Sequence, residues 1–460
     1  MMMANDKSPA DTTPRRMRSP WNHPYYILFI LFLLWMLSFL DRQMLGLLVT
    51  PIRSDLGLSD FQISLLQGFS FALFYGCAGL PIGWMVDRFP RRPIFYAGIT
   101  IWGLAATGCG LATTFTQLFV ARMFVGVGEA ALSPAGYSLL ADVFPRTRLS
   151  FAISVAAMGG ALGSGLAFAL GGFILELGHS GALDYPVLGD FEPWQQVFIL
   201  TGLPGLLIGF LVFTFPEPQR RSYRENTAGV RANNEDASMR AFVSYLRCYP
   251  RFYTCHILGF TSFSIANYGF QAWAAEYMRR EFGWSSVEIG LTFGTALSIA
   301  VIAAYFLGGL LVDRLFSRGM RDAHLRVFFW FAVACIPLSI WTLLTPDPWV
   351  FLVVSTIWGI FSISFGGAAA AALQITTPPQ FRGRVSSLYL VVVVLLGMSV
   401  GPSSIAALTQ FVLGEDSYLG TSMLIVMMIV YPLGAAMFAA GMKPMRDRID
   451  EIDGMTTHVT

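Results

Sequence analysis

Two adjacent ionisable residues, Asp41 and Arg42, lie inside the first long apolar stretch of the sequence. A second acid and base, Glu129 and Arg122, lie in the fourth such stretch. A single charge at bilayer depth costs about 2.5–3.5 kcal/mol on insertion scales, so such residues face a partner or a water-filled cavity rather than lipid. They point by default to a functional site, and the alternative is a buried ion pair that only fixes helix packing.

The chemistry open to these residues is anion binding and proton transfer. An arginine stays protonated and binds a carboxylate or phosphate through two N–H groups. Burial favours the protonated form of a carboxylic acid, and a neighbouring arginine favours the ionised form. We therefore expect Arg42 to contact an anionic headgroup, while Asp41 and Glu129 compete for Arg42 or carry protons.

Membrane-spanning helices must position these residues. The chain has 460 residues, of which 55% are hydrophobic and 13% charged, whereas an average soluble domain has about 25% charged residues. We predict an all-α polytopic membrane protein, because stretches long enough to cross about 30 Å of hydrocarbon recur along the chain. Twelve such stretches lie near residues 25–50, 60–86, 93–112, 116–141, 150–176, 195–215, 252–278, 287–312, 325–345, 348–373, 384–412 and 419–441.

The basic residues predict the orientation. If both termini are cytoplasmic, most of the 30 Lys and Arg fall in tails and loops on that side, as the positive-inside rule expects. The opposite side has only Arg53, Arg279 and Arg280. We expect a multi-pass protein of the plasma (cytoplasmic or inner) membrane.

We divide the chain into five parts. They are a disordered N-terminal tail (1–20), a six-helix bundle (21–215), a cytoplasmic linker (216–251), a second six-helix bundle (252–441) and a C-terminal tail (442–460). Residues 237–249 of the linker form either an amphipathic helix on the anionic inner leaflet or a solvated connector.

The two predicted bundles repeat a motif. Gly83-Trp-Met-Val-Asp87-Arg88 ends the second apolar stretch, and Gly309-Leu-Leu-Val-Asp313-Arg314 ends the eighth. Internal repeats of this kind indicate two pseudo-symmetric bundles with a substrate site between them near the membrane midplane.

Twelve spans, a central linker and this repeated loop resemble the major facilitator superfamily. Arg122, Gly126 and Gly128 match the arginine-glycine motif of that family's fourth helix. The resemblance implies two six-helix bundles whose first and fourth helices line a central cavity. The four charges then form one network that is neutral when all are ionised, and Arg122 has a mainly structural role. Gly83, Asp87, Arg88, Arg91 and Arg92 stand at the positions of the family's loop signature.

A narrower resemblance is to the Spinster family of lysolipid and sphingolipid transporters. It rests on three segments: Phe39-Leu-Asp41-Arg42-Gln43, Arg122-x3-Gly126-Val-Gly128-Glu129-Ala130 and Ala141-Asp142-Val-Phe144. Arg382-Gly383-Arg384, before the eleventh span, is similar to that family too.

The loop signature implies a conformational latch. Asp87 can approach the N-terminus of the eleventh span, which carries a positive dipole end, when the bundles close on the cytoplasmic side. Asp313 can do the same at the fifth span, and the alternative is that Asp87 only neutralises nearby arginines. The residues assigned to the latch are Gly83, Asp87, Arg88, Arg91, Arg92, Asp313, Arg314, Arg382 and Arg384.

The second half has few charges at mid-depth. One charged wall and one aromatic, apolar wall suit an amphiphile whose headgroup lies toward the first half and whose chain lies along the second. Each polar or aromatic residue of the second half has the alternative of a core or interface role. The residues expected to line the cavity are Asn267, Tyr268, Gln271, Trp273, Ser364, Gln374 and Tyr389.

Other classes of protein lack support in the sequence. Gly126-Val-Gly128-Glu129-Ala130 lies inside a membrane helix, where glycines allow close packing, and is no nucleotide-binding loop. The five cysteines lack metal-ligand spacing. We therefore expect no cofactor, no metal, no enzymatic activity and no nucleic-acid partner.

The prediction that follows is a monomeric secondary active transporter surrounded by membrane lipids. It is linked to protons and moves a lysolipid-like or sphingolipid-like anionic amphiphile by alternating access. One alternative is a proton-coupled symporter of a small organic anion, such as a carboxylate or sugar phosphate. Another is a lipid sensor that keeps the scaffold of a transporter without transporting.

Overall fold

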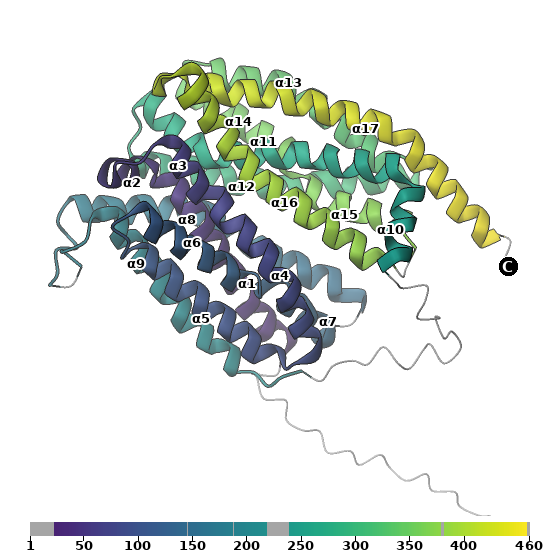
Figure 1. Ribbon diagram of the computed structural model, residues 1–460, viewed down its shortest axis with the longest axis horizontal. Helices are drawn as coiled ribbons and strands as arrows, with labels where there is room; N and C mark the ends of the chain where they lie inside the picture. Colours follow the sequence, from purple (N-terminus) through teal and green to yellow (C-terminus); the bar gives the residue numbers. More distant parts are fainter. Residues whose placement is uncertain (1–22, 145, 187, 219–238, 379–380, 458–460) are drawn as a thin grey trace, which may run out of the picture.

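The protein is described by a computed structural model that covers residues 23–144, 146–186, 188–218, 239–378 and 381–457. All regular structure in these residues is helical. Figure 1 shows two groups of roughly parallel helices, one from the first half of the chain and one from the second.

The described residues of the first half form nine α-helices. Short helices and turns punctuate the long ones, as the chain order shows: α1 (Pro24–Leu47), α2 (Val49–Leu56), α3 (Asp60–Ser64), the π-helical turn η2 (Leu65–Phe69), α4 (Ser70–Arg88), α5 (Arg91–Cys109), α6 (Phe115–Glu129), α7 (Leu132–Val143), α8 (Arg146–His179), α9 (Pro193–Gly209) and the 3₁₀ turn η3 (Phe210–Phe213).

The second half begins with a short helix and continues with long ones. In chain order these are α10 (Met239–Cys248), α11 (Pro250–Phe282), α12 (Ser286–Ser317), α13 (Ala323–Leu344), α14 (Pro348–Ile363), α15 (Phe365–Thr376), α16 (Arg382–Ala407), the π-helical turn η5 (Leu408–Leu413), the 3₁₀ turn η6 (Asp416–Tyr418) and α17 (Leu419–Thr457).

The helices occupy all twelve predicted stretches. Ten helical segments in the described residues are long and apolar enough to cross a membrane, and the more polar α5 and α11 lie at the two remaining places. Asp347 separates α13 from α14 because its carboxylate accepts the backbone N–H of Trp349 at 2.8 Å and caps the new helix. The predicted all-α fold with twelve spans is confirmed.

The fourth and tenth spans are both broken in the middle. The fourth changes from α6 to α7 at Ala130 and Ala131, and the tenth changes from α14 to α15 at Ser364. These spans hold corresponding places in the two halves, so the break follows the internal repeat that the sequence shows.

The two bundles pack closely against each other at one end of the molecule and less closely at the other. We name the end where α1 begins and α17 ends the terminal side, and the end that carries α2 and α3 the far side. Near the far side, α8 and α12 approach backbone to backbone, since a methyl group on Gly294 would lie 2.6 Å from the carbonyl oxygen of Gly165. Toward the terminal side, a methyl group on Gly76, Gly79, Gly83, Gly309, Gly366 or Gly367 would have no atom of another element within 4 Å.

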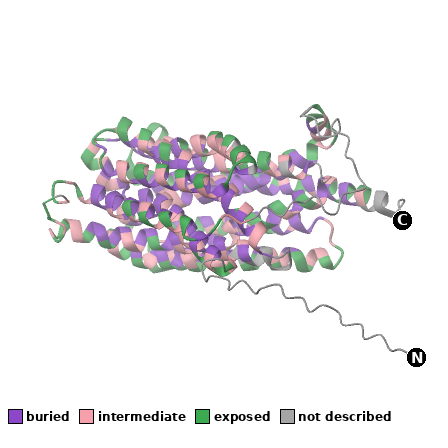
Figure 2. Cartoon of the chain, turned by 90° about the horizontal axis from the view of Figure 1, so that it is seen from below, coloured by how far each residue is buried: buried purple, intermediate pink, exposed green. Residues whose placement is uncertain are grey.

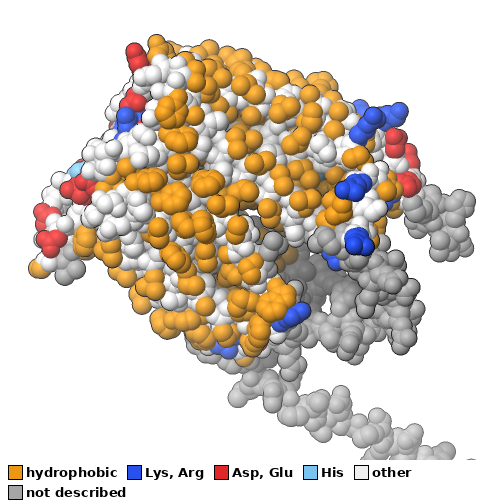
Figure 3. All heavy atoms as spheres, viewed as in Figure 1, with side chains coloured by type: hydrophobic (Ala, Val, Ile, Leu, Met, Phe, Trp, Pro, Cys, Tyr) orange, Lys and Arg blue, Asp and Glu red, His pale blue; other side chains and the backbone are white. Residues whose placement is uncertain are grey.

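The distribution of hydrophobic and charged side chains is the one expected of a membrane protein. Buried residues run along the inner faces of the long helices (Figure 2). Hydrophobic side chains cover the flank of the molecule, and Lys and Arg gather at the terminal side of the face shown in Figure 3. The apolar flank is the surface that lipid covers.

Candidate functional site

Asp41 and Arg122 form an ion pair in the interior of the first bundle. Arg122 Nη1 lies 3.0 Å from Asp41 Oδ2 and joins α6 to α1. Asp41 is 4% exposed and Arg122 is fully buried. Removing one partner of a buried pair leaves an uncompensated charge, so this pair ties the two helices together.

Arg42 and Glu129 form a second ion pair beside the first. Arg42 Nε and Nη2 each lie 2.5 Å from Glu129 Oε2. The Ser38 hydroxyl donates to the same carboxylate oxygen at 2.6 Å. The other oxygen, Oε1, is buried and has no hydrogen-bond partner in the part of the chain that the structure describes. The glutamate therefore uses one oxygen for its partners and keeps the other available for a proton.

Aromatic rings surround the Arg42 guanidinium. Its central carbon lies 5.0, 4.6 and 5.1 Å from the ring centroids of Phe39, Phe71 and Tyr75. A guanidinium over an aromatic face gains about 0.5–2 kcal/mol. The rings therefore hold the guanidinium beside Glu129 by cation–π contacts.

Glycines bring α6 close enough to place Glu129. A methyl group on Gly126 would lie 2.5 Å from the Phe71 carbonyl oxygen of α4. One on Gly128 would lie 2.5 Å from the Trp102 backbone nitrogen of α5. The expectation that these glycines serve helix packing is confirmed. Glu129 is the last residue of α6, directly before the break in the fourth span.

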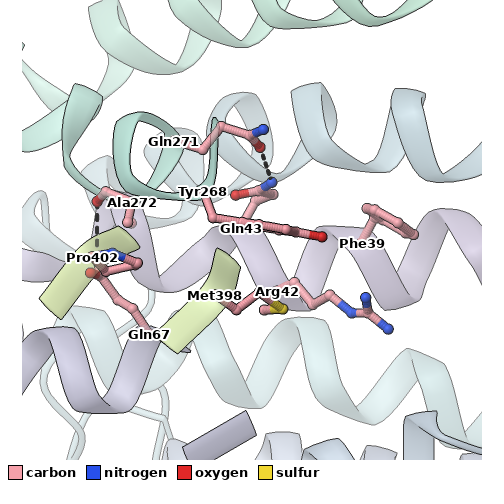
Figure 4. A pocket seen from close by; sticks show the side chains of 10 residues that line it. Phe39, Arg42, Gln43, Gln67, Tyr268, Gln271, Ala272, Met398 and Pro402 are labelled. Atoms are coloured by element: carbon pink, nitrogen blue, oxygen red, sulfur yellow. Dashed lines mark hydrogen bonds between the residues drawn. The ribbon is translucent and has the colours of Figure 1, made fainter. Parts of the chain in front are cut away.

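A small cavity of about 40 Å³, which we call the pocket, lies between the bundles next to Arg42. The first bundle contributes Arg42 and the second bundle contributes no charged residue to it. Figure 4 shows the side chains that converge on it. The lining residues are Phe39, Arg42, Gln43, Gly46, Gln67, Tyr268, Gln271, Ala272, Met398 and Pro402.

Amides close this pocket toward the far side. Gln43 Nε2 donates to Gln271 Oε1 (Figure 4). Gln67 Nε2 donates to the Ala272 carbonyl oxygen at 3.0 Å. Both hydrogen bonds cross from the first bundle to the second, so they must break before the pocket can open on that side.

A charge cluster forms a second barrier further out, and we call it the far-side lock. It consists of Arg53 and Asp60 from the first bundle and Glu276, Arg280 and Asp416 from the second. Arg280 donates to both carboxylate oxygens of Asp60, at 3.0 and 3.1 Å, and to Glu276 at 2.6 Å. Arg53 lies 2.5 Å from Asp416. Asp60 and Glu276 are each 3% exposed.

Sequence reasoning missed the far-side lock. It identified Arg53, Arg279 and Arg280 as the bases of that side but assigned them no partner. The available signal was the acid Asp60 at the start of the second span, where few acids occur. The partner of Asp60 lies 220 residues away along the chain, so spacing within one helix could not reveal it.

The four predicted charges come together as two pairs rather than one continuous network. Arg42 is the member of the set that lines the pocket. Glu129 lies behind it, and Asp41 and Arg122 lie deeper in the first bundle. This arrangement gives Arg42 access to a ligand while both acids keep an arginine partner.

Of the seven residues expected to line the cavity, two line the pocket and a third contacts one of these two. The other four do not line it. Tyr268 and Gln271 line the pocket, and the Asn267 amide oxygen accepts a hydrogen bond from Gln271. Trp273 is fully buried and donates to the Pro402 carbonyl oxygen at 3.1 Å. The remaining three lie elsewhere: Ser364 at the break of the tenth span, Gln374 at an exposed position where it donates to Ser386, and Tyr389 in the interior beside His256.

The predicted latch residues of the first half contact their own bundle. Arg91 forms ion pairs with Asp142 and Glu217, and Arg92 donates to the carbonyl oxygens of Val212 and Phe213. Arg88 lies 4.4 Å over the Trp84 ring. Gly83 faces open space. The Asp87 side chain lies outside the described residues.

The predicted latch residues of the second half are exposed or bound locally. Asp313 and Arg314 are exposed at the end of α12. Arg382 donates to the Thr377 carbonyl oxygen at 2.9 Å, and Arg384 lies 5.9 Å over the Phe242 ring. The described contacts of Arg382 and Arg384 are thus with residues of the second half of the chain.

Glu217 is expected to contribute to stability in a pH-dependent way. Partial burial acts to raise its pKa, but hydrogen bonds from the Arg91 side chain and from the backbone N–H groups of Arg92 and Arg91 hold the pKa below its ordinary value. A depressed pKa means that the stabilisation is present at neutral pH and is lost as the pH falls through that pKa. We expect Glu217→Gln to cost about 1 kcal/mol or less at pH 7, since this carboxylate is only partly buried and solvent screens the ion pair.

Thermal unfolding followed by tryptophan fluorescence at pH 7 and pH 3.5 checks this expectation. The difference between the wild type and Glu217→Gln should shrink at the lower pH. A matched control is Glu176→Gln, an exposed acid on α8. A difference that is equal at both pH values would show that Glu217 acts through packing alone.

Comparison with known proteins gives one family over most of the chain. The model of the Major Facilitator Superfamily matches residues 31–402. An MFS-type efflux pump of Mycolicibacterium smegmatis is 25% identical over 426 residues, which is 92% of this chain and 94% of the pump. A hexuronate transporter of Bacillus subtilis is 24% identical over 65% of this chain and 67% of its own length.

Two further comparisons concern Spinster proteins. Protein spinster of Drosophila melanogaster is 20% identical over 67% of this chain and 49% of its own length. A crystal structure of a bacterial homolog of the human lysosomal transporter Spinster, inward-facing and unoccupied, superposes with a TM-score of 0.79. It is 24% identical and covers 94% of this chain and 98% of the solved one. That likeness supports the fold.

Proposed function

The chain belongs to the major facilitator superfamily, and from this premise we propose that it moves a lysolipid or related anionic amphiphile by proton-linked alternating access. The observation that supports the proposal most is the placement of Arg42. It lines a pocket between the bundles, and its present partner is a single carboxylate oxygen of Glu129.

The proposed cycle exchanges partners at Arg42. An anionic headgroup that reaches Arg42 offers two oxygens to its guanidinium and competes with Glu129. Once displaced, the buried Glu129 carboxylate lacks its counter-ion and takes up a proton. Asp41 remains paired with Arg122 and keeps α1 and α6 together throughout. Cargo binding and protonation are thereby linked through one side chain.

The asymmetry of the pocket supports an amphiphile as cargo. The first bundle presents a charge and the second presents Tyr268, Gln271, Ala272, Met398 and Pro402. Ala272, Met398 and Pro402 offer an apolar surface to an acyl chain, beside the polar Tyr268 and Gln271. The headgroup in this proposal lies at Arg42 and the chain lies against α11 and α16.

We further propose that the terminal side is cytoplasmic. The Lys and Arg of the described residues concentrate there, as the positive-inside rule expects. In that orientation the structure is open to the cytoplasm, and the far-side lock seals the opposite face. The predicted latch around Asp87 and Asp313 would form only after the terminal side closes.

Binding competition tests the nature of the cargo. The purified protein is incubated with radiolabelled lysophosphatidylglycerol, and unlabelled lysophosphatidylglycerol or glucuronate is added as competitor. We expect the lysolipid to compete at a concentration at least about tenfold lower. The reverse order would favour the second candidate, a symporter of a small organic anion, which the similarity to a hexuronate transporter supports.

Arg42→Lys is expected to weaken lysolipid binding about tenfold or more. Lysine keeps the charge but loses the planar pair of N–H donors, and hydrogen bonds to charged groups contribute about 1.5–3 kcal/mol. The same competition assay measures the change. Arg318→Lys, at an exposed arginine outside the pocket and the far-side lock, is the matched control, and equal affinity in the wild type and Arg42→Lys would contradict the assignment of the headgroup to Arg42.

A further inference from the structure

Helix α10 lies across the ends of the second bundle instead of along it. Figure 1 shows its axis running crosswise to the spans at the terminal side, and Figure 2 shows the same helix nearly end-on. It follows the linker and precedes α11, so the chain passes through it between the two bundles.

Contacts place α10 at the depth where neighbouring spans leave the membrane. The Tyr245 hydroxyl donates to the Thr376 carbonyl oxygen at 3.2 Å, and Thr376 is the last residue of one candidate span. Arg384 lies 5.9 Å over the Phe242 ring, and Arg384 is the first residue of the next candidate span. A helix fixed to both ends lies at the level of lipid headgroups.

The aromatic face of α10 is already covered by protein. Phe242 and Tyr245 both pack against the Phe381 ring, at centroid distances of 6.0 and 5.1 Å. The Tyr245 and Tyr253 hydroxyls lie 2.6 Å apart. This face therefore does not insert into the acyl chains, as an isolated amphipathic helix on a membrane would.

The opposite face of α10 is basic and exposed. Arg240, Val243 and Arg247 are exposed and lie three, four and seven positions apart, which aligns them on one side of the helix. Arg251 is exposed at the start of α11, after Tyr249, which separates the two helices. The segment from Met239 to Arg251 contains no acidic residue that would neutralise them.

We propose that this basic surface, formed by Arg240 and Arg247 on α10 and Arg251 at the start of α11, binds the anionic headgroups of the membrane leaflet on the terminal side. The depth of α10 in the membrane places these arginines at the lipid headgroups, and their positive charge is complementary to the phosphate groups. The second bundle is held to that leaflet by an electrostatic contact separate from the pocket. The inference does not depend on the identity of the cargo.

A probe on the native Cys248 tests the proposal, because that thiol is exposed on α10. Cys77 and Cys255 are replaced by alanine, and Cys248 is labelled with an environment-sensitive fluorophore in the full chain. The protein is placed in nanodiscs of phosphatidylcholine alone or with about 30% phosphatidylglycerol. We expect the anionic discs to reduce acrylamide quenching about twofold, and 0.5 M salt to reverse the effect by screening.

The triple variant R240Q/R247Q/R251Q should show equal quenching in both discs, while Arg318→Gln, an exposed arginine elsewhere on the terminal side, should behave as the wild type. Equal quenching of the wild type in both discs overturns the proposal. So does a response to soluble polyglutamate that is stronger than the response to anionic lipid, because it would point to an acidic protein partner. An anionic-lipid effect that survives in the triple variant also overturns it.

Discussion

Replacing Glu129 by glutamine is expected to lower transport driven by a pH gradient about 100-fold, because the change leaves Arg42 without its anionic partner. Loss of one partner of a buried ion pair costs about 3–5 kcal/mol. Glutamine also keeps an oxygen for the Ser38 hydroxyl but takes up no proton. Uptake of labelled lysophosphatidylglycerol into proteoliposomes, with and without an imposed pH gradient, measures the effect.

Two variants make this result specific. Glu176→Gln carries the same chemical change on an exposed part of α8 and should transport as the wild type does. Asp41→Asn should destabilise the protein as well as slow transport, since Asp41 holds Arg122 at 3.0 Å in the interior. Wild-type rates with an unchanged pH dependence in Glu129→Gln would refute the proposed proton coupling.

Neutralising Asp60 is expected to shift the protein toward a state that is open on the far side. Asp60→Asn removes the negative charge and replaces one of the two oxygens that accept hydrogen bonds from Arg280 by an NH2 group. The expected change in the balance of states is about 1–3 kcal/mol, a factor of roughly 5–150, because Arg280 keeps Glu276 as a partner. Spin labels at Ser54 and Ser417, both exposed on the far side, report the separation of the bundles.

The reversed pair Asp60→Arg with Arg280→Asp provides the control. If the two residues act through each other, the double variant should recover the short label distance that each single variant loses. If Asp60 serves only to begin α3, the double variant will be as impaired as Asp60→Arg alone. Distances that do not change in Asp60→Asn would show that the amides around the pocket hold the far side closed without the lock.

Hydrophobic length was enough to predict the spans, because lipid requires a continuous apolar stretch with an internally bonded backbone. The Thr345-to-Pro348 break appeared in the sequence for the same reason, and Asp347 caps α14 there. The choice of cavity-lining residues on α11 was harder. Asn267 and Gln271 are one turn apart and share a face, whereas Trp273 points elsewhere on the same helix and donates to α16.

Pairings between distant helices were the part that the sequence could not supply. The resemblance to the major facilitator superfamily predicted that Asp41, Arg42, Arg122 and Glu129 would meet, because the first and fourth helices of that family line one cavity. It could not decide which acid takes which arginine, because that depends on how α1 rotates against α6. The far-side lock was harder still to predict from the sequence. Its hydrogen bonds form only where the two bundles meet, and the pattern of residues along one helix does not show which residues of the other bundle it meets.

The interrupted fourth and tenth spans have a consequence for how the molecule opens and closes. The end of α6 carries Glu129, and α7 begins afresh at Leu132; α14 and α15 meet at Ser364 in the same manner. Each of these spans has a joint at mid-depth, so α7 and α15 can bend inward while α6 and α14 stay upright. Closure by bending would let the terminal ends come together while Asp41 on α1 and Arg122 on α6 stay paired.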